Sequence, residues 1–199
     1  MSLEDLTPMQ VDFLKELTNI GGGNAATALS QMVNHPIKME VPMVQLLPYD
    51  KLFSDTMGEE EQVNAVSVRV LGDIPGNFLF VLKDKDALDL IEMITGNIVK
   101  CLDGVVISAL QEICNIICSS YINTLSRMLN LTLISSVPAF AQDMFGAILP
   151  TAYIEAGQIE DDLLIIENYF LADKKRMKAH LFFIPHPGSL HKIFSIINL

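Results

Sequence analysis

Two long segments of the chain place apolar residues at the spacing of an amphipathic helix. Stepping about 100° per residue from Leu14 brings small and apolar positions onto one narrow stripe, and the same holds from Leu110. We expect this stripe to pack on a β-sheet. Its members are Leu14, Leu17, Gly21, Ala25, Ala28 and Met32 in the first segment, and Leu110, Ile113, Ile117, Tyr121, Thr124 and Met128 in the second.

Both segments begin with a helix start signal. Thr7 offers an N-cap hydroxyl, Pro8 follows at the first helical position, and Gln10 stands three residues after the cap. Asp103 is the corresponding cap of the second segment. The sequence therefore predicts two long helices that begin at equivalent points.

The side of each helix opposite the stripe carries polar and small residues, which we expect to face water. Within each set a glutamate and an asparagine are three residues apart, so their side chains are neighbours on the helix surface. The sets are Asp12, Glu16, Asn19 and Gly23 in the first helix, and Ser108, Glu112, Asn115 and Ser119 in the second.

Three consecutive glycines, residues 21–23, interrupt the first helical pattern but do not recur in the second, where Ile117, Cys118 and Ser119 stand instead. A phosphate-binding glycine loop lies between a strand and a helix, whereas these glycines lie inside a helix. We interpret Gly21 as a site of close packing between helix and sheet. Gly23 and Ser119 share only small size, which would let another backbone approach the glutamate and asparagine.

The chain repeats itself at a shift of 96 residues. Residues 14–20 fall on residues 110–116 with Glu and Asn matched, and Val41-Pro42 falls on Val137-Pro138. A looser match joins residues 77–94 to residues 179–197 at a somewhat larger offset. We therefore predict two similar halves, about 1–100 and 101–199, within a single domain.

Each half also carries strand signals. Residues 63–71 alternate and are β-branched, residues 163–171 are apolar, and turn residues follow at 72–77 and 172–176. Pro42 and Pro138 would fix the edge or end of the strand that follows each long helix. The predicted fold class is α+β: an internally duplicated single domain with an antiparallel sheet packed against long helices, related by a pseudo-twofold axis.

Composition narrows the possible partners. Half of the 199 residues are hydrophobic, and 24 acidic residues outnumber 13 basic ones, for a formal net charge of -11. Nucleic acid is disfavoured as a partner because few basic side chains are present to neutralise phosphates, and a basic protein partner fits better.

Apolar runs such as residues 162–172 are broken by charges before they reach the roughly 18 residues that cross a bilayer. We expect no membrane span and, with an acidic N-terminus, a cytoplasmic protein.

Cysteine and histidine provide no obvious metal or nucleophile site. Cys101 is expected to be a reduced thiol, and Cys114 and Cys118 to be buried small hydrophobes, since no third ligand is suitably spaced. The histidines occur in unlike contexts and are interpreted as surface or loop residues: His35, His180, His186 and His191. We expect no metal site and no cofactor bound by the chain itself.

The chemistry available to the Glu–Asn pair is limited. An asparagine amide cannot exchange a proton near neutral pH, so it can orient water or stabilise charge, whereas a glutamate can act as a base or pair with a lysine. One exposed Glu or Asn is ordinarily a solvated surface residue. Two matched pairs on exposed faces have no packing reason to persist, which points to a site that completes an active site supplied by its substrate.

The doubled pattern resembles the signature of the CheC, CheX and FliY family of chemotaxis phosphatases. The pattern is Asp or Ser, three residues, Glu, two residues, Asn, twenty-two residues, Pro, and with both copies intact in a chain little longer than the duplicated core it is most similar to the CheC branch. The copies are Asp12-Glu16-Asn19-Pro42 and Ser108-Glu112-Asn115-Pro138.

The resemblance implies an activity and roles for these residues. The substrate would be the phosphorylated response regulator CheY, which brings its own aspartyl phosphate and Mg²⁺. Asn19 and Asn115 would each position the attacking water, while Glu16 and Glu112 would pair with the regulator's active-site lysine. Because the regulator already hydrolyses itself slowly, orienting one water is a sufficient source of catalysis.

The resemblance also implies a second partner, the receptor deamidase CheD, bound through the segment after Pro138, where we place Asp143 in a short helix. The alternative to an enzyme is thus a non-catalytic binding module that regulates CheD. A flagellar switch component of the FliY kind is disfavoured, because the 199 residues leave no room for a further C-terminal domain. Two sites in one chain remove the need for a dimer, so we expect a monomer.

Overall fold

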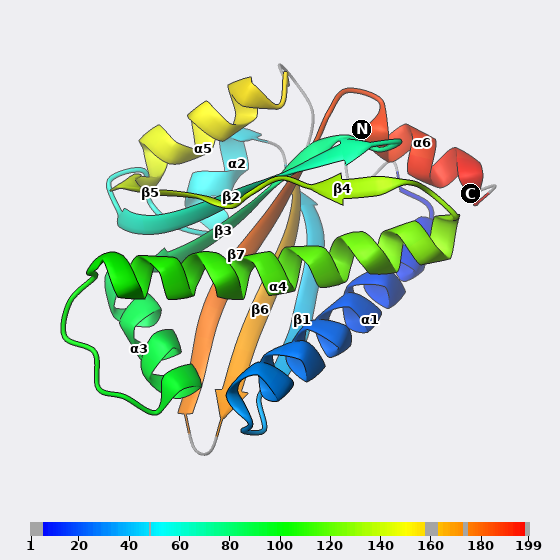
Figure 1. Ribbon diagram of the computed structural model, residues 1–199. Coiled ribbons are helices and arrows are strands. Elements are labelled where there is room, and N and C mark those ends of the chain that lie inside the picture. The colour runs from blue at the N-terminus through cyan, green and yellow to red at the C-terminus, as the bar shows by residue number, and fades with distance from the viewer. Residues whose placement is uncertain (1–5, 48, 158–162, 173–174, 198–199) are drawn as a thin grey trace.

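The computed structural model describes residues 6–47, 49–157, 163–172 and 175–197, and within them each half of the chain has the same order of elements (Figure 1). The order is long helix, strand, short helix, strand pair and closing helix. The first half contains α1 (Pro8–Val33), β1 (Lys38–Leu47), α2 (Tyr49–Asp55), β2 (Gln62–Gly72), β3 (Gly76–Lys83) and α3 (Asp84–Thr95). The second contains α4 (Gly104–Leu129), β4 (Leu133–Ser135), β5 (Ala139–Met144), α5 (Phe145–Glu155), β6 (Leu163–Ala172), β7 (Lys175–Pro185) and α6 (Ser189–Ile196).

One antiparallel sheet joins the two halves. Its order is β1-β6-β7-β3-β2-β4, and β5 also pairs with β2. The first strand of each half therefore pairs with the strand pair of the other half: β1 with β6, and β4 and β5 with β2. The central pair β3 and β7 marks the pseudo-twofold axis, so the predicted α+β duplication is confirmed.

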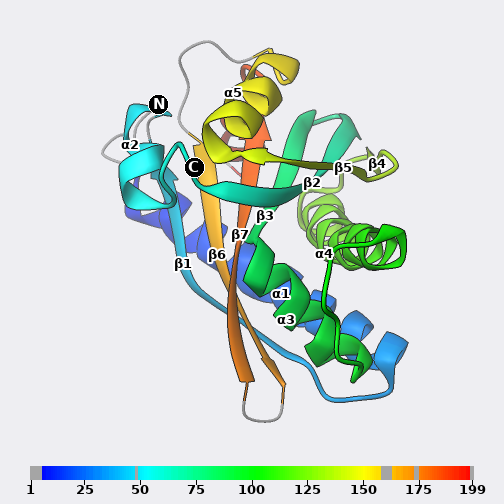
Figure 2. The same cartoon turned by 90° about the vertical axis from the view of Figure 1, so that its left-hand side faces the viewer.

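Helices cover both faces of this sheet. The larger core lies under α1, α3, α4 and α6, and a smaller core of residues such as Leu52, Phe145 and Phe182 lies under α2 and α5. Figure 2 shows α2 and α5 together at the upper end of the sheet, with β6 and β7 extending beyond them. The two long helices consequently share one face of the molecule.

The predicted helix starts are confirmed. Thr7 and Gln10 form a reciprocal capping box, in which the Gln10 amide N–H donates to Thr7 Oγ1 at 3.3 Å and the Thr7 N–H donates to Gln10 Oε1 at 2.9 Å. Asp103 Oδ1 accepts the N–H groups of Val105 and Val106 at 3.0 and 2.9 Å. Each cap fixes the register of its helix and hence the direction of the side chains on its outer face.

The helix α1 runs unbroken through its three glycines, but Gly21 does not pack on the sheet as we predicted. A Cβ at Gly21 would lie 2.5 Å from Cδ1 of Tyr121 on α4. At Gly22 a Cβ would lie 3.0 Å from Cγ2 of Val41 on β1. Gly21 therefore serves the crossing of α1 with α4, where Tyr121 fills the space that the glycine leaves, and Gly22 lets Val41 of β1 approach α1.

The last turns of both long helices also depart from the predicted stripe. Met32 and Met128, expected to be buried, expose 46% and 38% of their surface. The end of α1 faces α3 and the beginning of α4 instead of the sheet, because Met32 lines a groove with Ile94 and Ala109. Leu29 is the buried leucine near the end of α1, and Leu125 and Leu129 are buried near the end of α4.

The helix α4 is apolar and long enough to cross a membrane by length and composition alone, and among the described residues no other helix meets both criteria. Half of its most apolar window is buried inside the protein. Its Leu110, Ile113 and Ile117 belong to the main core, which is the environment expected for a core helix.

Candidate functional site

Each Glu–Asn pair lies on the outer face of a long helix. Glu16 and Asn19 are exposed on α1, as predicted, and Glu112 is exposed on α4. Asn115 is half-buried, so the second pair is less open than the first. Residues three apart on a helix have neighbouring side chains, and each pair can therefore contact one partner group together.

The supporting positions follow the same faces. Asp12 and Gly23 are exposed on α1, and a Cβ at Gly23 would meet nothing within 4 Å. Ser108 is exposed on α4 and its Oγ donates to the carbonyl of Gly104 at 2.8 Å, whereas Ser119 is half-buried. The outer face of α1 is exposed over about three helical turns, and the outer face of α4 is partly enclosed on one flank.

Strands β4 and β5 enclose this flank; both run alongside α4 (Figure 1). Pro138 lies between these strands, and its carbonyl accepts the side-chain amide of Gln111 at 3.0 Å. Sequence reasoning missed this contact. The sequence did contain a hint of it. The residue before the glutamate is Lys15 in the first copy and Gln111 in the second, and of these two only glutamine is an uncharged hydrogen-bond donor.

Pro42 lies in the equivalent place of the first copy. It belongs to β1, an edge strand, where the pairing with β6 shifts register between Glu40 and Met43. A proline is tolerated at an edge or a bulge because it cannot donate to a ladder. The Pro42 side chain lies outside the described residues.

A groove of about 360 Å³ opens on the other flank of the second pair. Glu112 lies on its rim, and its walls come from the end of α1, the end of α3 and the beginning of α4. The lining residues are Met32, Val33, Ile94, Thr95, Ala109, Glu112 and Ile113. Apart from Glu112 and Thr95 the walls are apolar.

No thiol is exposed beside either pair among the described residues. The two cysteines near Asn115 are fully buried, with Cys114 Sγ 3.6 Å from Cys118 Sγ. Burial raises the pKa of the Cys118 thiol well above its usual value, and the hydrogen bond with Cys114 raises it further. Both cysteines are therefore buried core residues, as the sequence predicted.

The described residues also contain no group of three or more His, Cys, Asp or Glu side chains that could hold a metal ion. Each outer face offers a carboxylate and an amide, which can hold a water molecule and neutralise a cation.

One histidine was placed wrongly. We expected His180 on the surface or in a loop, but it is buried in β7, opposite Glu167 of β6. Burial lowers its pKa to about 4, with nearby Lys178 adding to the effect. The sequence context of the histidines did not indicate that this one lies inside a buried strand. Because α1 and α4 cover the other face of the sheet, His180 belongs to neither pair.

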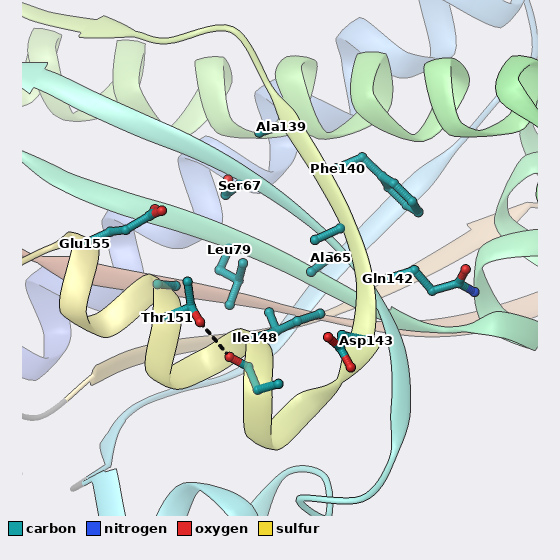
Figure 3. Close-up of a pocket in the computed structure, with 13 residues that line it drawn as sticks. Ala65, Ser67, Leu79, Ala139, Phe140, Gln142, Asp143, Ile148, Thr151 and Glu155 are labelled. Atoms are coloured by element: carbon teal, nitrogen blue, oxygen red, sulfur yellow. Dashed lines mark hydrogen bonds between the residues drawn. The ribbon is translucent and has the colours of Figure 1, made fainter.

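Asp143 is not in a short helix as we predicted; it lies in β5, just before α5. Its Oδ1 accepts the N–H of Met144 at 2.8 Å. Figure 3 shows Asp143 beside a cavity of about 340 Å³ between β2, β5 and α5. Ala65, Leu79 and Ile148 give this cavity an apolar lining, and it lies on the sheet face that α1 and α4 do not cover.

Comparison with known proteins gives a consistent result. The sequence model of the CheC-like family matches residues 9–45 and 105–141, which span both Glu–Asn pairs and both prolines. The CheY-P phosphatase CheC of Bacillus subtilis (strain 168) is 33% identical over 192 residues, covering 93% of this chain and 92% of that protein. The flagellar motor switch phosphatase FliY of the same organism is 29% identical over 130 residues, covering 63% of this chain and 34% of that protein.

Solved structures show the same fold at lower identity. The crystal structure of Thermotoga maritima FliY has a TM-score of 0.76 at 24% identity and covers 98% of both chains. A chain in the FliG–FliM complex from H. pylori has a TM-score of 0.69 at 8% identity, covering 94% of this chain and all of that one.

Proposed function

This chain belongs to the CheC-like family, and we propose that it hydrolyses the aspartyl phosphate of a CheY-type response regulator. The observation that carries the proposal is the presence of two Glu–Asn pairs, each on the outer face of a long helix. A phosphoryl group attached to a folded protein cannot enter a deep pocket. An open helix face can approach it.

The amides are the proposed catalytic groups. Asn19 or Asn115 binds a water molecule in line with the phosphorus, and the water oxygen displaces the regulator's aspartate carboxylate. The products are inorganic phosphate and the free carboxylate. The amide neither gains nor loses a proton, so its contribution is orientation of the nucleophile.

The glutamates are the proposed anchors. Glu16 or Glu112 pairs with the regulator's active-site lysine, which holds the amide one helical turn away at the phosphoryl group. The Mg²⁺ that such a reaction needs comes with the regulator, where it neutralises charge on the phosphoryl oxygens. In this proposal the chain acts as a monomer in the cytoplasm.

Glu16→Gln/Glu112→Gln tests the anchoring role. The variant keeps the shape of both faces and removes their charge, so we expect KM for the phosphorylated regulator to rise about three- to tenfold, as for the loss of one partly desolvated ion pair per site. The rate at saturation should change little. Initial rates of phosphate release measure both. An unchanged KM would show that the glutamates do not anchor the regulator.

The cavity beside Asp143 favours a second candidate function, binding of a CheD-type deamidase. The cavity lies on the sheet face opposite the two phosphatase helices, so both partners have separate surfaces. Asp143 provides an exposed carboxylate beside apolar walls, which suits a protein contact with a basic residue.

Asp143→Lys should abolish binding of the deamidase and leave hydrolysis at the wild-type rate, because the substitution reverses charge at a cavity on the sheet face opposite both helices. Asp143→Asn, which removes the charge and keeps the shape, should weaken binding by a smaller factor. Titration calorimetry with the deamidase and phosphate release with the regulator measure the two effects. Parallel losses in both assays would show that the surfaces are not separate.

A further inference from the structure

The Val-Pro pair that recurs after each long helix has two different environments. Val41 is half-buried and packs against α1, with Cγ2 3.0 Å from the position that a Cβ on Gly22 would occupy. Its counterpart Val137 exposes 86% of its surface. Two copies of one motif thus differ in whether the valine side chain is packed or presented to solvent.

The long helices differ at the matched position. Gly22 leaves room for Val41, whereas the matched residue in α4 is Cys118, which is fully buried. β1 continues through its valine and proline with only a shift of register, but the second copy breaks into β4 and β5 at residues 136–138. The break turns Val137 outward.

The segment that carries Val137 is held on both sides. On one side the Ser136 N–H donates to the Arg69 carbonyl at 2.8 Å, and Ser136 Oγ accepts the Arg69 N–H at 2.9 Å. On the other side Gln111 donates to the Pro138 carbonyl at 3.0 Å. An exposed valine in a fixed position loses little conformational freedom when it is covered, which makes it a good contact for a partner.

This segment is continuous with the second Glu–Asn pair. Gln111 directly precedes Glu112 and lies one helical turn before Asn115 on α4. We propose that Val137 is an apolar contact for the phosphorylated response regulator bound at Glu112 and Asn115, and that Gln111 is the positioning residue that holds it there. The inference rests on the proposed function and makes the second site the one with the larger contact surface.

The test uses a chain in which Asn19→Ala leaves only the second site. In that parent, Val137→Asp should raise KM for the phosphorylated regulator about tenfold and keep the rate at saturation, because burying a valine contributes to binding and not to the reacting geometry. Ile154→Asp is the matched control, since Ile154 is 74% exposed on α5, outside the proposed contact, and should leave KM unchanged.

Gln111→Ala separates positioning from simple stability. It should raise KM by a smaller factor, and the Gln111→Ala/Val137→Asp double variant should be no worse than Val137→Asp alone, because both changes remove the same contact. Independent, additive effects would overturn the role of Gln111.

The failures of the two proposals are distinguishable. If the Asn19→Ala parent speeds decay of the phosphorylated regulator but Val137→Asp has the parent KM, the inference is wrong and the proposed function stands. If the wild type is active and the parent is not, the second site is inactive and the inference is again wrong. If the wild type itself has no effect on decay, the proposed function fails and the inference fails with it.

Discussion

Asn19→Ala/Asn115→Ala is expected to remove essentially all of the acceleration that this chain gives to decay of a phosphorylated regulator. Each alanine deletes the amide that we propose to orient water on its helix face. Catalysis by orientation alone disappears when the orienting group is lost. The decay rate should return to that of the regulator by itself.

Binding should survive the same change. Glu16 and Glu112 remain in place, and Asn19 is exposed and Asn115 half-buried in the interior of a helix, where alanine has the higher helix propensity. We expect the double variant to bind a regulator that carries a beryllofluoride mimic of the phosphoryl group, measured by titration calorimetry. Each single variant should retain activity through its intact copy. A double variant that hydrolyses at the wild-type rate would exclude the amides as catalytic groups.

Gly72→Ala is expected to destabilise the fold by about 3 kcal/mol, since a strained backbone and a steric clash each cost about 1–3 kcal/mol. Gly72 has φ +110°, and a Cβ there would lie 2.2 Å from the backbone oxygen of Thr132. A backbone atom cannot move aside as a flexible side chain does. The β2–β3 turn must therefore shift.

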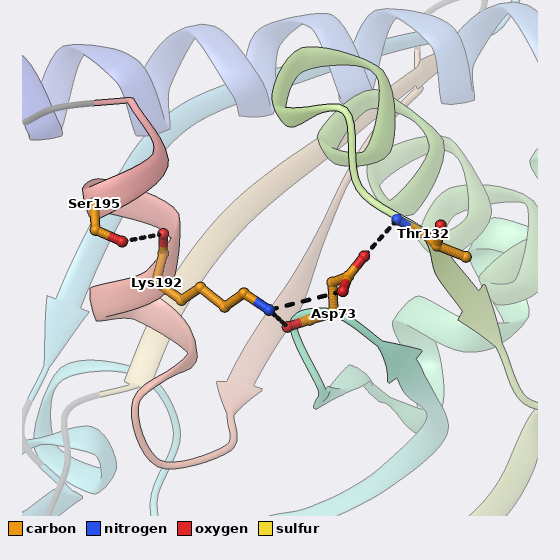
Figure 4. Close-up of polar contacts among 4 residues, drawn as sticks. All are labelled: Asp73, Thr132, Lys192 and Ser195. Carbon is orange, nitrogen blue, oxygen red and sulfur yellow. Dashed lines mark hydrogen bonds and ion pairs between the residues drawn. The ribbon is translucent and has the colours of Figure 1, made fainter.

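The turn after Gly72 joins three elements, as Figure 4 shows. One carboxylate oxygen of Asp73 accepts the Thr132 N–H at 2.8 Å, and the Asp73 backbone carbonyl accepts Lys192 Nζ at 2.7 Å. A shift at Gly72 would loosen the loop after α4 and the attachment of α6 together. We expect Tm to fall by about 6–12 °C for a chain of this size.

Gly96→Ala is the control for this prediction. Gly96 also has positive φ, +71°, at the end of α3, but a Cβ there would meet nothing within 4 Å. Its cost should be that of the left-handed backbone alone, about 1 kcal/mol. Thermal and urea unfolding measure the loss of unfolding free energy in each variant. Equal losses would show that the clash with the Thr132 backbone does not contribute to the destabilisation.

The repeat explains why so much of the fold could be predicted. Residues 14–20 align with residues 110–116. A helix-capping signal in one copy therefore supported the prediction of a helix at the same place in the other copy. Period and turn residues then gave β2 and β6 within a few positions of their observed bounds. These signals are local, and the caps at Thr7 and Asp103 hold them in register.

The features that were missed depend on contacts between the halves. Gly21 of α1 meets Tyr121 of α4. His180 lies beside Val81 of β3, a strand of the first half, and Asp143 extends β5 because that strand pairs with β2. The order of polar and apolar residues along the chain does not show which surfaces of the two halves contact each other.

The most direct test of the central claim measures the decay rate of a phosphorylated CheY-type regulator in the presence of Mg²⁺. The wild-type chain is added at a small fraction of the regulator's concentration. We predict that each chain molecule removes many phosphoryl groups and that the decay rate rises in proportion to the chain added. Decay that stays at the regulator's own rate at every concentration of chain would contradict the proposal that this protein is a phosphatase.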